Sequence, residues 1–225
     1  MCGRYTLTNA DPAVLKARFG IDLASDFDER PRFNIAPTDP VLAIRTGEGG
    51  RREAGRLRWG LLPGPWAQDS SRALINARAE TIAEQPAYRE SFETRRCLIP
   101  ADGFYEWCEG KLGKQAMWIN RVDDEPFAFA GIWAALRNGG ESVHSCAIVT
   151  CAPNDVVRPI HDRMPVILDR GAEPEWIRPE ARPEGLLGLL RPIDSDVLDV
   201  REVSDAVNDV RQDGPHLLAP PLKLF

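Results

Sequence analysis

Short apolar segments with the character of β-strands outnumber the helical segments of this sequence, and the two kinds do not alternate. A doubly wound parallel sheet needs regular alternation of strands and helices. The order found here favours an α+β domain, with a mostly antiparallel, barrel-like sheet and peripheral short helices. The strand-like segments are residues 41–45, 56–62, 97–107, 116–120, 127–136, 143–151, 164–168 and 197–203, and the helical segments are residues 12–19, 76–92 in two pieces broken near Pro86, 171–177 and 183–190.

The first helical segment has the clearest ends. Asp11 is placed to cap its N-terminus, Pro12 suits the first helical turn, and Gly20 is a typical stop. The next turn-rich stretch, TGEGGRREAG at 46–55, separates two strand-like segments. Its two arginines are compatible with the rim of a polyanion site and equally with a plain solvated hairpin.

The length of the chain and its cysteines limit the classes of protein to which it can belong. At 225 residues, the chain is expected to form a single domain over residues 1–225 and to bury a core without disulfides or metal. Its five cysteines are an odd number without a C-x-x-C spacing, which favours reduced thiols and a cytoplasmic location. No apolar run is long enough for a signal peptide or a membrane span, so no membrane partner is expected.

One group of potential metal ligands needs a separate interpretation. His144, Cys146 and Cys151 lie close together, but their spacing fits no usual zinc site. We interpret them as core residues of one strand, with a metal site as the lesser alternative. The sequence therefore predicts neither a bound metal nor a cofactor.

The charge balance argues against a protein that binds nucleic acid by bulk attraction, because the net charge is -6. However, 24 of the 28 basic residues are arginine, whose planar guanidinium binds two phosphate oxygens at once, as lysine cannot. Genome composition alone also produces such a bias. Residues 1–110 hold 15 basic and 16 acidic side chains, and residues 111–225 hold 13 and 18. An anion-binding face is therefore expected in the first half.

The chain opens with MCGRY, so removal of the first methionine would make Cys2 the N-terminal residue. Its α-amine, with a reference pKa of about 7.7–8.0, would be partly neutral near pH 7 and able to attack an aldehyde. The adjacent thiol could then close onto the imine carbon and form a five-membered thiazolidine. Taken alone, however, the MC start favours the simpler interpretation that Cys2 is only the second residue of a cytoplasmic protein.

Four further side chains carry chemistry at useful positions. In an extended segment, Asn76 and Arg78 would point the same way, the amide toward the Cys2 amine and the guanidinium toward a phosphate. Glu106 lies in the aromatic run GFYEW, where burial would raise its pKa and suit it to proton transfer, unless it faces solvent. His161 could donate a proton to a leaving oxygen, or could simply cap a loop.

Nine motifs, spread in order over residues 1 to about 210, resemble the SOS response-associated peptidase family, whose members process abasic sites in DNA. They are MCGRY, RFNIAPT (32–38), WGLLPGPW (59–66), NARAET (76–81), RCLIPADGFYEW (96–107), FAFAGIW (127–133), TCAPND (150–155), IHDRMPVIL (160–168) and VSDAVND (203–209). The resemblance implies loss of Met1 and a covalent link between Cys2 and the ring-opened aldehyde of an abasic site in single-stranded DNA. The link ends as a thiazolidine, which shields the lesion and can be reversed.

The resemblance also implies roles for individual residues. Cys2 is the nucleophile, Asn76 positions it, and Glu106 and His161 serve the proton transfers. Three arginines match positions expected to hold phosphates, and one tryptophan matches an aromatic that stacks on an unpaired base; they are Arg4, Arg78, Arg163 and Trp66. The implied activity is lyase-type cross-linking chemistry with an associated cysteine autopeptidase. The protein is expected to act as a monomer in the cytoplasm, at the nucleoid when bound to DNA.

Two other functions remain open. In the first, Cys2, Glu106 and His161 form a thiol–base arrangement of a peptidase that acts mainly to remove its own Met1. In the second, the protein is a passive binding module for single-stranded or modified DNA. That module would keep its activity after loss of Cys2.

Overall fold

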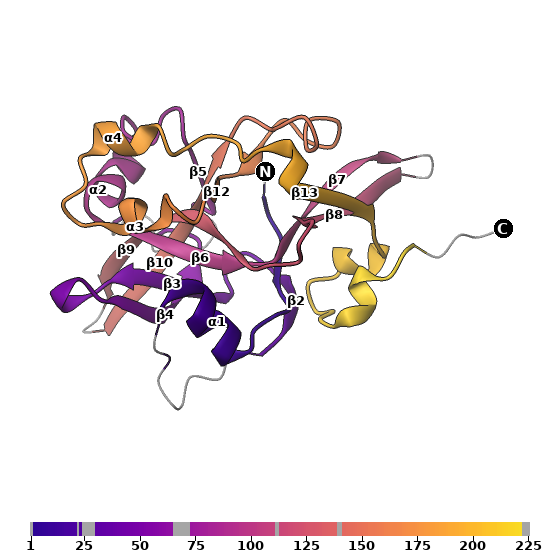
Figure 1. Ribbon diagram of the computed structural model, residues 1–225, viewed down its shortest axis with the longest axis horizontal. Helices are drawn as coiled ribbons and strands as arrows, with labels where there is room; N and C mark the ends of the chain where they lie inside the picture. Colours follow the sequence, from indigo (N-terminus) through magenta and orange to yellow (C-terminus); the bar gives the residue numbers. More distant parts are fainter. Residues whose placement is uncertain are drawn as a thin grey trace.

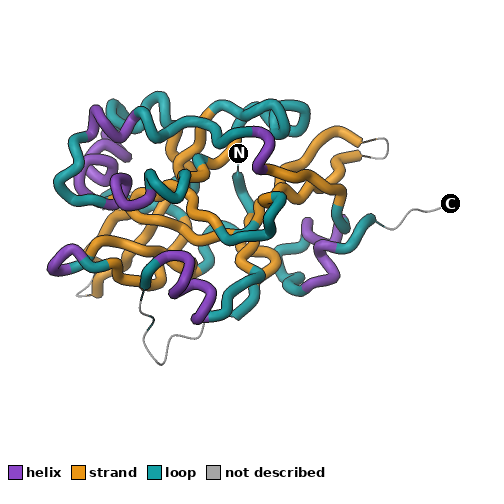
Figure 2. Tube along the Cα trace, viewed as in Figure 1, coloured by secondary structure: helices purple, strands orange, loops and turns teal. Residues whose placement is uncertain are grey.

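The computed structural model describes residues 2–21, 23, 30–64, 73–110, 113–138 and 141–221 as two sheets with short helices around them (Figures 1 and 2). The strands are β1 (Tyr5–Leu7), β2 (Arg32–Ile35), β3 (Pro40–Thr46), β4 (Arg52–Trp59), β5 (Asn76–Arg78), β6 (Arg96–Ala101), β7 (Gly103–Gly110), β8 (Gly113–Arg121), β9 (Phe127–Asn138), β10 (Glu141–Cys151), β11 (Met164–Pro165), β12 (Ile167–Leu168) and β13 (Leu198–Glu202). The α-helices are α1 (Pro12–Phe19), α2 (Pro86–Thr94), α3 (Glu173–Ile177) and α4 (Pro183–Leu187), and the 3-10 helices include η1 (Glu48–Gly50), η4 (Ser195–Val197), η5 (Asp205–Asn208) and η6 (Pro215–Leu218).

The larger sheet is barrel-like. Its strands follow the order β10-β4-β3-β6-β9, and β9 pairs back onto β10, which closes the ring. All these pairs are antiparallel except β10 with β4, and β5 also joins β10 in parallel. Strand β9 has the sequence FAFAGIWAALRN and is flanked by β6 and β10, which explains its near-continuous apolar run. The predicted α+β class with a mostly antiparallel, barrel-like sheet is confirmed.

The second sheet, in the order β13-β8-β7-β1-β2, lies beside the ring (Figure 1). The N-terminal strand β1 pairs with β2 on one side and with β7 on the other. The described chain therefore starts where the two sheets meet, and Cys2, three residues before β1, is fully buried in the main core. This arrangement brings the beginning of the chain next to β7.

The helices are peripheral, as expected. Helices α2 and α3 pack on β9 and β6, at the same end of the molecule as α4, whereas η5 and η6 pack on β8 and β2 (Figure 1). Helix α1 begins and ends as predicted, because the Asp11 side chain accepts from the Ala13 amide and Gly20 takes a left-handed φ of 64°. Arg18 of α1 donates to both carboxylate oxygens of the buried Glu173 and fastens α1 to α3.

Three sequence-based assignments were wrong in detail. Residues 76–92, predicted to be helical in two pieces, instead contain strand β5, a turn, and then helix α2, which starts at Pro86. Strand β5 forms because β10 offers it a parallel edge, a tertiary pairing that local propensity does not show. The predicted strand 97–107 is two strands, β6 and β7, and the 46–55 loop is a hairpin in which β3 runs to Thr46 and β4 restarts at Arg52.

Two kinds of feature are absent from the described part of the chain. There, no helix combines the length and apolar character needed to cross a membrane. The same residues contain no group of three or more His, Cys, Asp or Glu side chains placed to hold a metal ion. His144, Cys146 and Cys151 all lie on β10, and both cysteines are buried.

Candidate active site

Cys2 is held in place through its backbone. The Asn76 Nδ2 atom donates a hydrogen bond of 2.9 Å to the Cys2 carbonyl oxygen. Asn76 is itself fixed at the start of β5, where it pairs with Ile148 of β10 and its carbonyl accepts from the Tyr88 hydroxyl at 3.0 Å. The amide is therefore anchored on a rigid strand, and it holds the start of the chain from there.

The thiol of Cys2 is buried and protonated. Its residue has 0 % exposure, and burial raises the pKa of the thiol, with the nearby Glu106 carboxylate raising it further. The thiol hydrogen faces the Arg4 carbonyl oxygen at 4.0 Å. A thiol in this environment needs a proton acceptor before it can act as a nucleophile.

Glu106 supplies an acid beside Cys2. It lies on β7 between Tyr105 and Trp107, and it is only 2 % exposed. Burial raises the pKa of Glu106 to about 7, and the charge of Asp162 raises it as well. Of the two possibilities for this residue, the buried acid is the one found, so the carboxyl can both give and take a proton near neutral pH.

His161 completes the group. Its Nε2 atom lies 3.9 Å from Glu106 Oε2, and its Nδ1 accepts a hydrogen bond of 2.9 Å from the Arg163 backbone N–H. An Nδ1 that accepts leaves the proton of the neutral ring on Nε2, which faces Glu106. Asp162 Oδ1 also lies 2.9 Å from Nδ1, but this carboxylate is 88 % exposed, whereas the backbone N–H of Arg163 is fixed and therefore sets the tautomer. Burial lowers the pKa of His161, which favours the neutral ring.

A cavity of about 490 Å³ opens beside this group. It is lined by the two proton-transfer residues and three neighbours, namely Glu106, Trp107, Lys114, His161 and Asn208. The Trp107 indole N–H donates to Asn208 Oδ1 at 2.8 Å, which fixes one wall. The cavity therefore gives a ligand access to Glu106 and His161.

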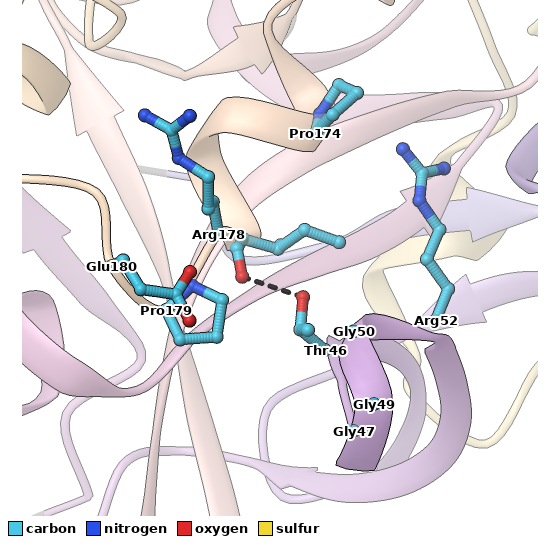
Figure 3. A pocket seen from close by; sticks show the side chains of 10 residues that line it. Thr46, Gly47, Gly49, Gly50, Arg52, Pro174, Arg178, Pro179 and Glu180 are labelled. Carbon is cyan, nitrogen blue, oxygen red and sulfur yellow. Dashed lines mark hydrogen bonds between the residues drawn. The ribbon is translucent and has the colours of Figure 1, made fainter.

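A second cavity, of about 530 Å³, shares no lining residue with the first. It lies between the tip of the β3–β4 hairpin and the end of α3, where the Thr46 hydroxyl donates to the Ile177 carbonyl at 2.7 Å (Figure 3). Its lining arginines, Arg52 and Arg178, already interact with Glu173 and Glu175. This hairpin is not part of the group around Cys2.

The Arg4 side chain makes hydrogen bonds within the protein. Its Nη1 donates to Asn34 Oδ1 at 3.0 Å and to the Val207 carbonyl at 2.7 Å. Asn34 is buried and its Nδ2 donates to three carbonyl oxygens of the C-terminal segment, those of Val207, Asp209 and Gln212. Sequence reasoning gave Asn34 no role, and its only signal was its place inside the motif RFNIAPT.

Arg78 and Arg163 differ in their surroundings. Arg78 ends β5 and is exposed. Arg163 donates from Nη1 and Nη2 to both carboxylate oxygens of Glu80, at 2.6 and 2.9 Å, and from Nη2 to the Thr150 carbonyl at 2.6 Å. Glu80 also had no role in the sequence-based account. Trp66 lies outside the described residues.

Comparisons with known proteins place the chain in a family. Residues 1–210 match the family model described as SOS response associated peptidase (SRAP). The Abasic site processing protein YoqW of Bacillus subtilis is 39% identical over 97% of this chain and 99% of its own, and the Abasic site processing protein YedK of Escherichia coli is 30% identical over 98% and 100%. The Abasic site processing protein HMCES of Xenopus tropicalis is 29% identical over 97% of this chain and 78% of its own.

Solved structures agree with this assignment at the level of the fold. A protein from Bacteroides thetaiotaomicron superimposes with a TM-score of 0.83 at 24% identity, over 98% of this chain and 100% of the other. A protein from Bordetella bronchiseptica gives a TM-score of 0.78 at 27% identity, over 90% and 100%. With a family model that spans nearly its whole length, the chain belongs to the SOS response associated peptidase family.

Proposed function

We propose that this protein processes abasic sites in single-stranded DNA by forming a covalent bond through Cys2 after loss of Met1. One observation supports the proposal: Cys2 is fully buried, the Asn76 amide holds its carbonyl, and Glu106 and His161 lie together beside it. A chain start that only needed a stable fold would not require an acid with a pKa of about 7 beside it. The names of the relatives point to the same lesion.

The reaction begins when the sugar ring of the abasic site opens. The closed sugar is a hemiacetal, and protonation of its ring oxygen by Glu106 or His161 favours the free aldehyde. The neutral α-amine of Cys2 then attacks the aldehyde carbon, and the former carbonyl oxygen leaves as water. The thiol sulfur adds to the resulting imine carbon and its proton passes to nitrogen, which gives a thiazolidine with net loss of one water.

Asn76 is suited to orient the amine. Its Nδ2 is engaged by the Cys2 carbonyl, whereas its Oδ1 is buried and has no hydrogen-bond partner among the described residues. A buried amide oxygen without a partner costs free energy, so an N–H donor at this point would stabilise the site. We assign that donor to the α-amine that appears when Met1 is removed.

Removal of Met1 is part of the proposal, and the autopeptidase activity belongs to the same residues. Cys2 follows the peptide bond that must be cut, and we assign the role of nucleophile to its thiol and that of proton acceptor to Glu106, whose charge acts on that thiol. DNA is held by the phosphate-binding residues Arg4, Arg78 and Arg163, with Trp66 stacking on a base. We place the protein in the cytoplasm as a monomer.

The test uses a single-stranded oligonucleotide with one abasic site and a denaturing gel. Wild type is expected to form a slow-migrating adduct, Cys2→Ala none, and Glu106→Gln a slowly accumulating one. Cys108→Ala is the matched control, because Cys108 is a half-buried thiol on β7 to which no role is assigned. An oligonucleotide with a tetrahydrofuran in place of the aldehyde-forming sugar should give no adduct.

Two other outcomes would replace the proposal. Loss of Met1 without an adduct on abasic DNA would favour the peptidase that acts on itself. Equal DNA binding by wild type and Cys2→Ala, with no adduct from either, would favour the passive binding module.

A further inference from the structure

Glu80 occupies an unusual place next to the site. It follows β5 in the first turn after Arg78, and both its carboxylate oxygens accept hydrogen bonds from Arg163, at 2.6 and 2.9 Å. This fork-to-fork geometry is the one with which arginine binds a phosphate. The carboxylate therefore sits where a DNA phosphate on Arg163 would sit.

The electrostatic environment of Glu80 includes both arginines. The hydrogen bonds from Arg163 lower the pKa of Glu80, and the positive charge of Arg78 lowers it further. Glu80 is thus an anion between two of the arginines assigned to phosphates. Its side chain is 51 % exposed, whereas that of Arg163 is only 14 % exposed.

We propose that Glu80 is an internal substitute for a DNA phosphate, and that a strand must displace it from Arg163 to bind. The proposal rests on the proposed function, because it takes Arg163 as a phosphate ligand. Exchange requires only that Glu80 turn into solvent, which its exposure allows. Arg163 stays in position meanwhile, because the Thr150 carbonyl on β10 accepts from its Nη2 at 2.6 Å.

The consequence is selectivity between damaged and intact strands. Both kinds of strand carry phosphates, so Glu80 weakens the reversible binding of both. Only the abasic strand offers an aldehyde and is then retained by a covalent bond. Glu80 is therefore a specificity-determining residue that shortens the time spent on intact single-stranded DNA.

The test measures reversible binding of an intact, fluorescein-labelled single strand by anisotropy. Glu80→Gln is expected to bind about two- to fivefold more tightly than wild type, the range typical of an exposed ion pair that no longer has to be broken. Glu84→Gln is the matched control: it removes the same charge from the same turn region, and Glu84 is exposed and makes no ion pair among the described residues. The tightening should exceed that of the control.

A double-mutant cycle identifies Arg163 as the shared partner. In the Arg163→Ala background, Glu80→Gln should have no more effect than Glu84→Gln. Equal affinities of Glu80→Gln and Glu84→Gln in the wild-type background would overturn the proposal, as would a slower cross-link without tighter binding, which would make Glu80 a positioning residue for His161. Adduct formation on abasic DNA is scored in parallel with the same wild-type preparation, so failure of the proposed function is seen separately.

Discussion

The buried carboxyl of Glu106 makes the stability of this protein depend on pH in a calculable way. Its pKa is about 7 in the folded chain against an ordinary value of 4.5. At about 1.4 kcal/mol per pH unit, this difference corresponds to about 3 kcal/mol. Because the folded pKa is raised, the folded chain keeps a proton that the unfolded chain has already lost between these two values. The contribution of Glu106 to the free energy of unfolding therefore falls as pH rises from 4.5 to 7.

Glu106→Gln removes this titration and keeps the shape of the side chain. We expect the variant to gain stability relative to wild type by about 2–3 kcal/mol between about pH 5 and about pH 8. Urea unfolding of both proteins at several pH values gives the difference directly, and the subtraction removes the titration of all other groups. The same variant should cross-link slowly at every pH. A stability difference that does not change with pH would refute the reasoning.

Three further outcomes are expected. Glu173→Ala leaves the buried Arg18 guanidinium without its carboxylate, and urea unfolding should show a loss of about 3–5 kcal/mol. Arg96→Met leaves carbonyl oxygens of α2 and of the C-terminal end of α3 without their donor, and it should cost at least about 3 kcal/mol in the same assay. Asn76→Ala should lower the rate of cross-linking on denaturing gels by about 10-fold or more, because the amine loses its orienting partner.

Local sequence signals predicted the elements whose ends are set locally. Asp11 and Gly20 bound α1 because a side-chain cap and a left-handed glycine act within a few residues. Segment 76–78 was assigned wrongly because its structure depends on β10, more than sixty residues later in the chain. The ring closure between β9 and β10 is likewise a long-range property, and only the general class of sheet followed from the pattern of strands.

The residues of the site likewise fall into those that the local sequence predicts and those that depend on distant parts of the chain. The aromatic neighbours of Glu106 are adjacent in sequence, so its burial and raised pKa were predictable from the run GFYEW. Asn34 and Glu80 were missed because their partners are distant in sequence. Asn34 interacts with Arg4 and with the Val207 carbonyl. Glu80 pairs with Arg163. Nothing in the local sequence indicates these pairings.

The most direct test of covalent capture is the intact mass of the adduct before and after borohydride. Wild type is expected to give the mass of the protein without Met1 plus the abasic strand less one water, and borohydride should leave it unchanged, because a thiazolidine has no C=N bond to reduce. Cys2→Ser, prepared with Met1 already removed, has the amine and lacks the thiol, so its adduct should persist only when borohydride traps the imine. A wild-type adduct that retains Met1, or that maps to a residue other than Cys2, would contradict the account.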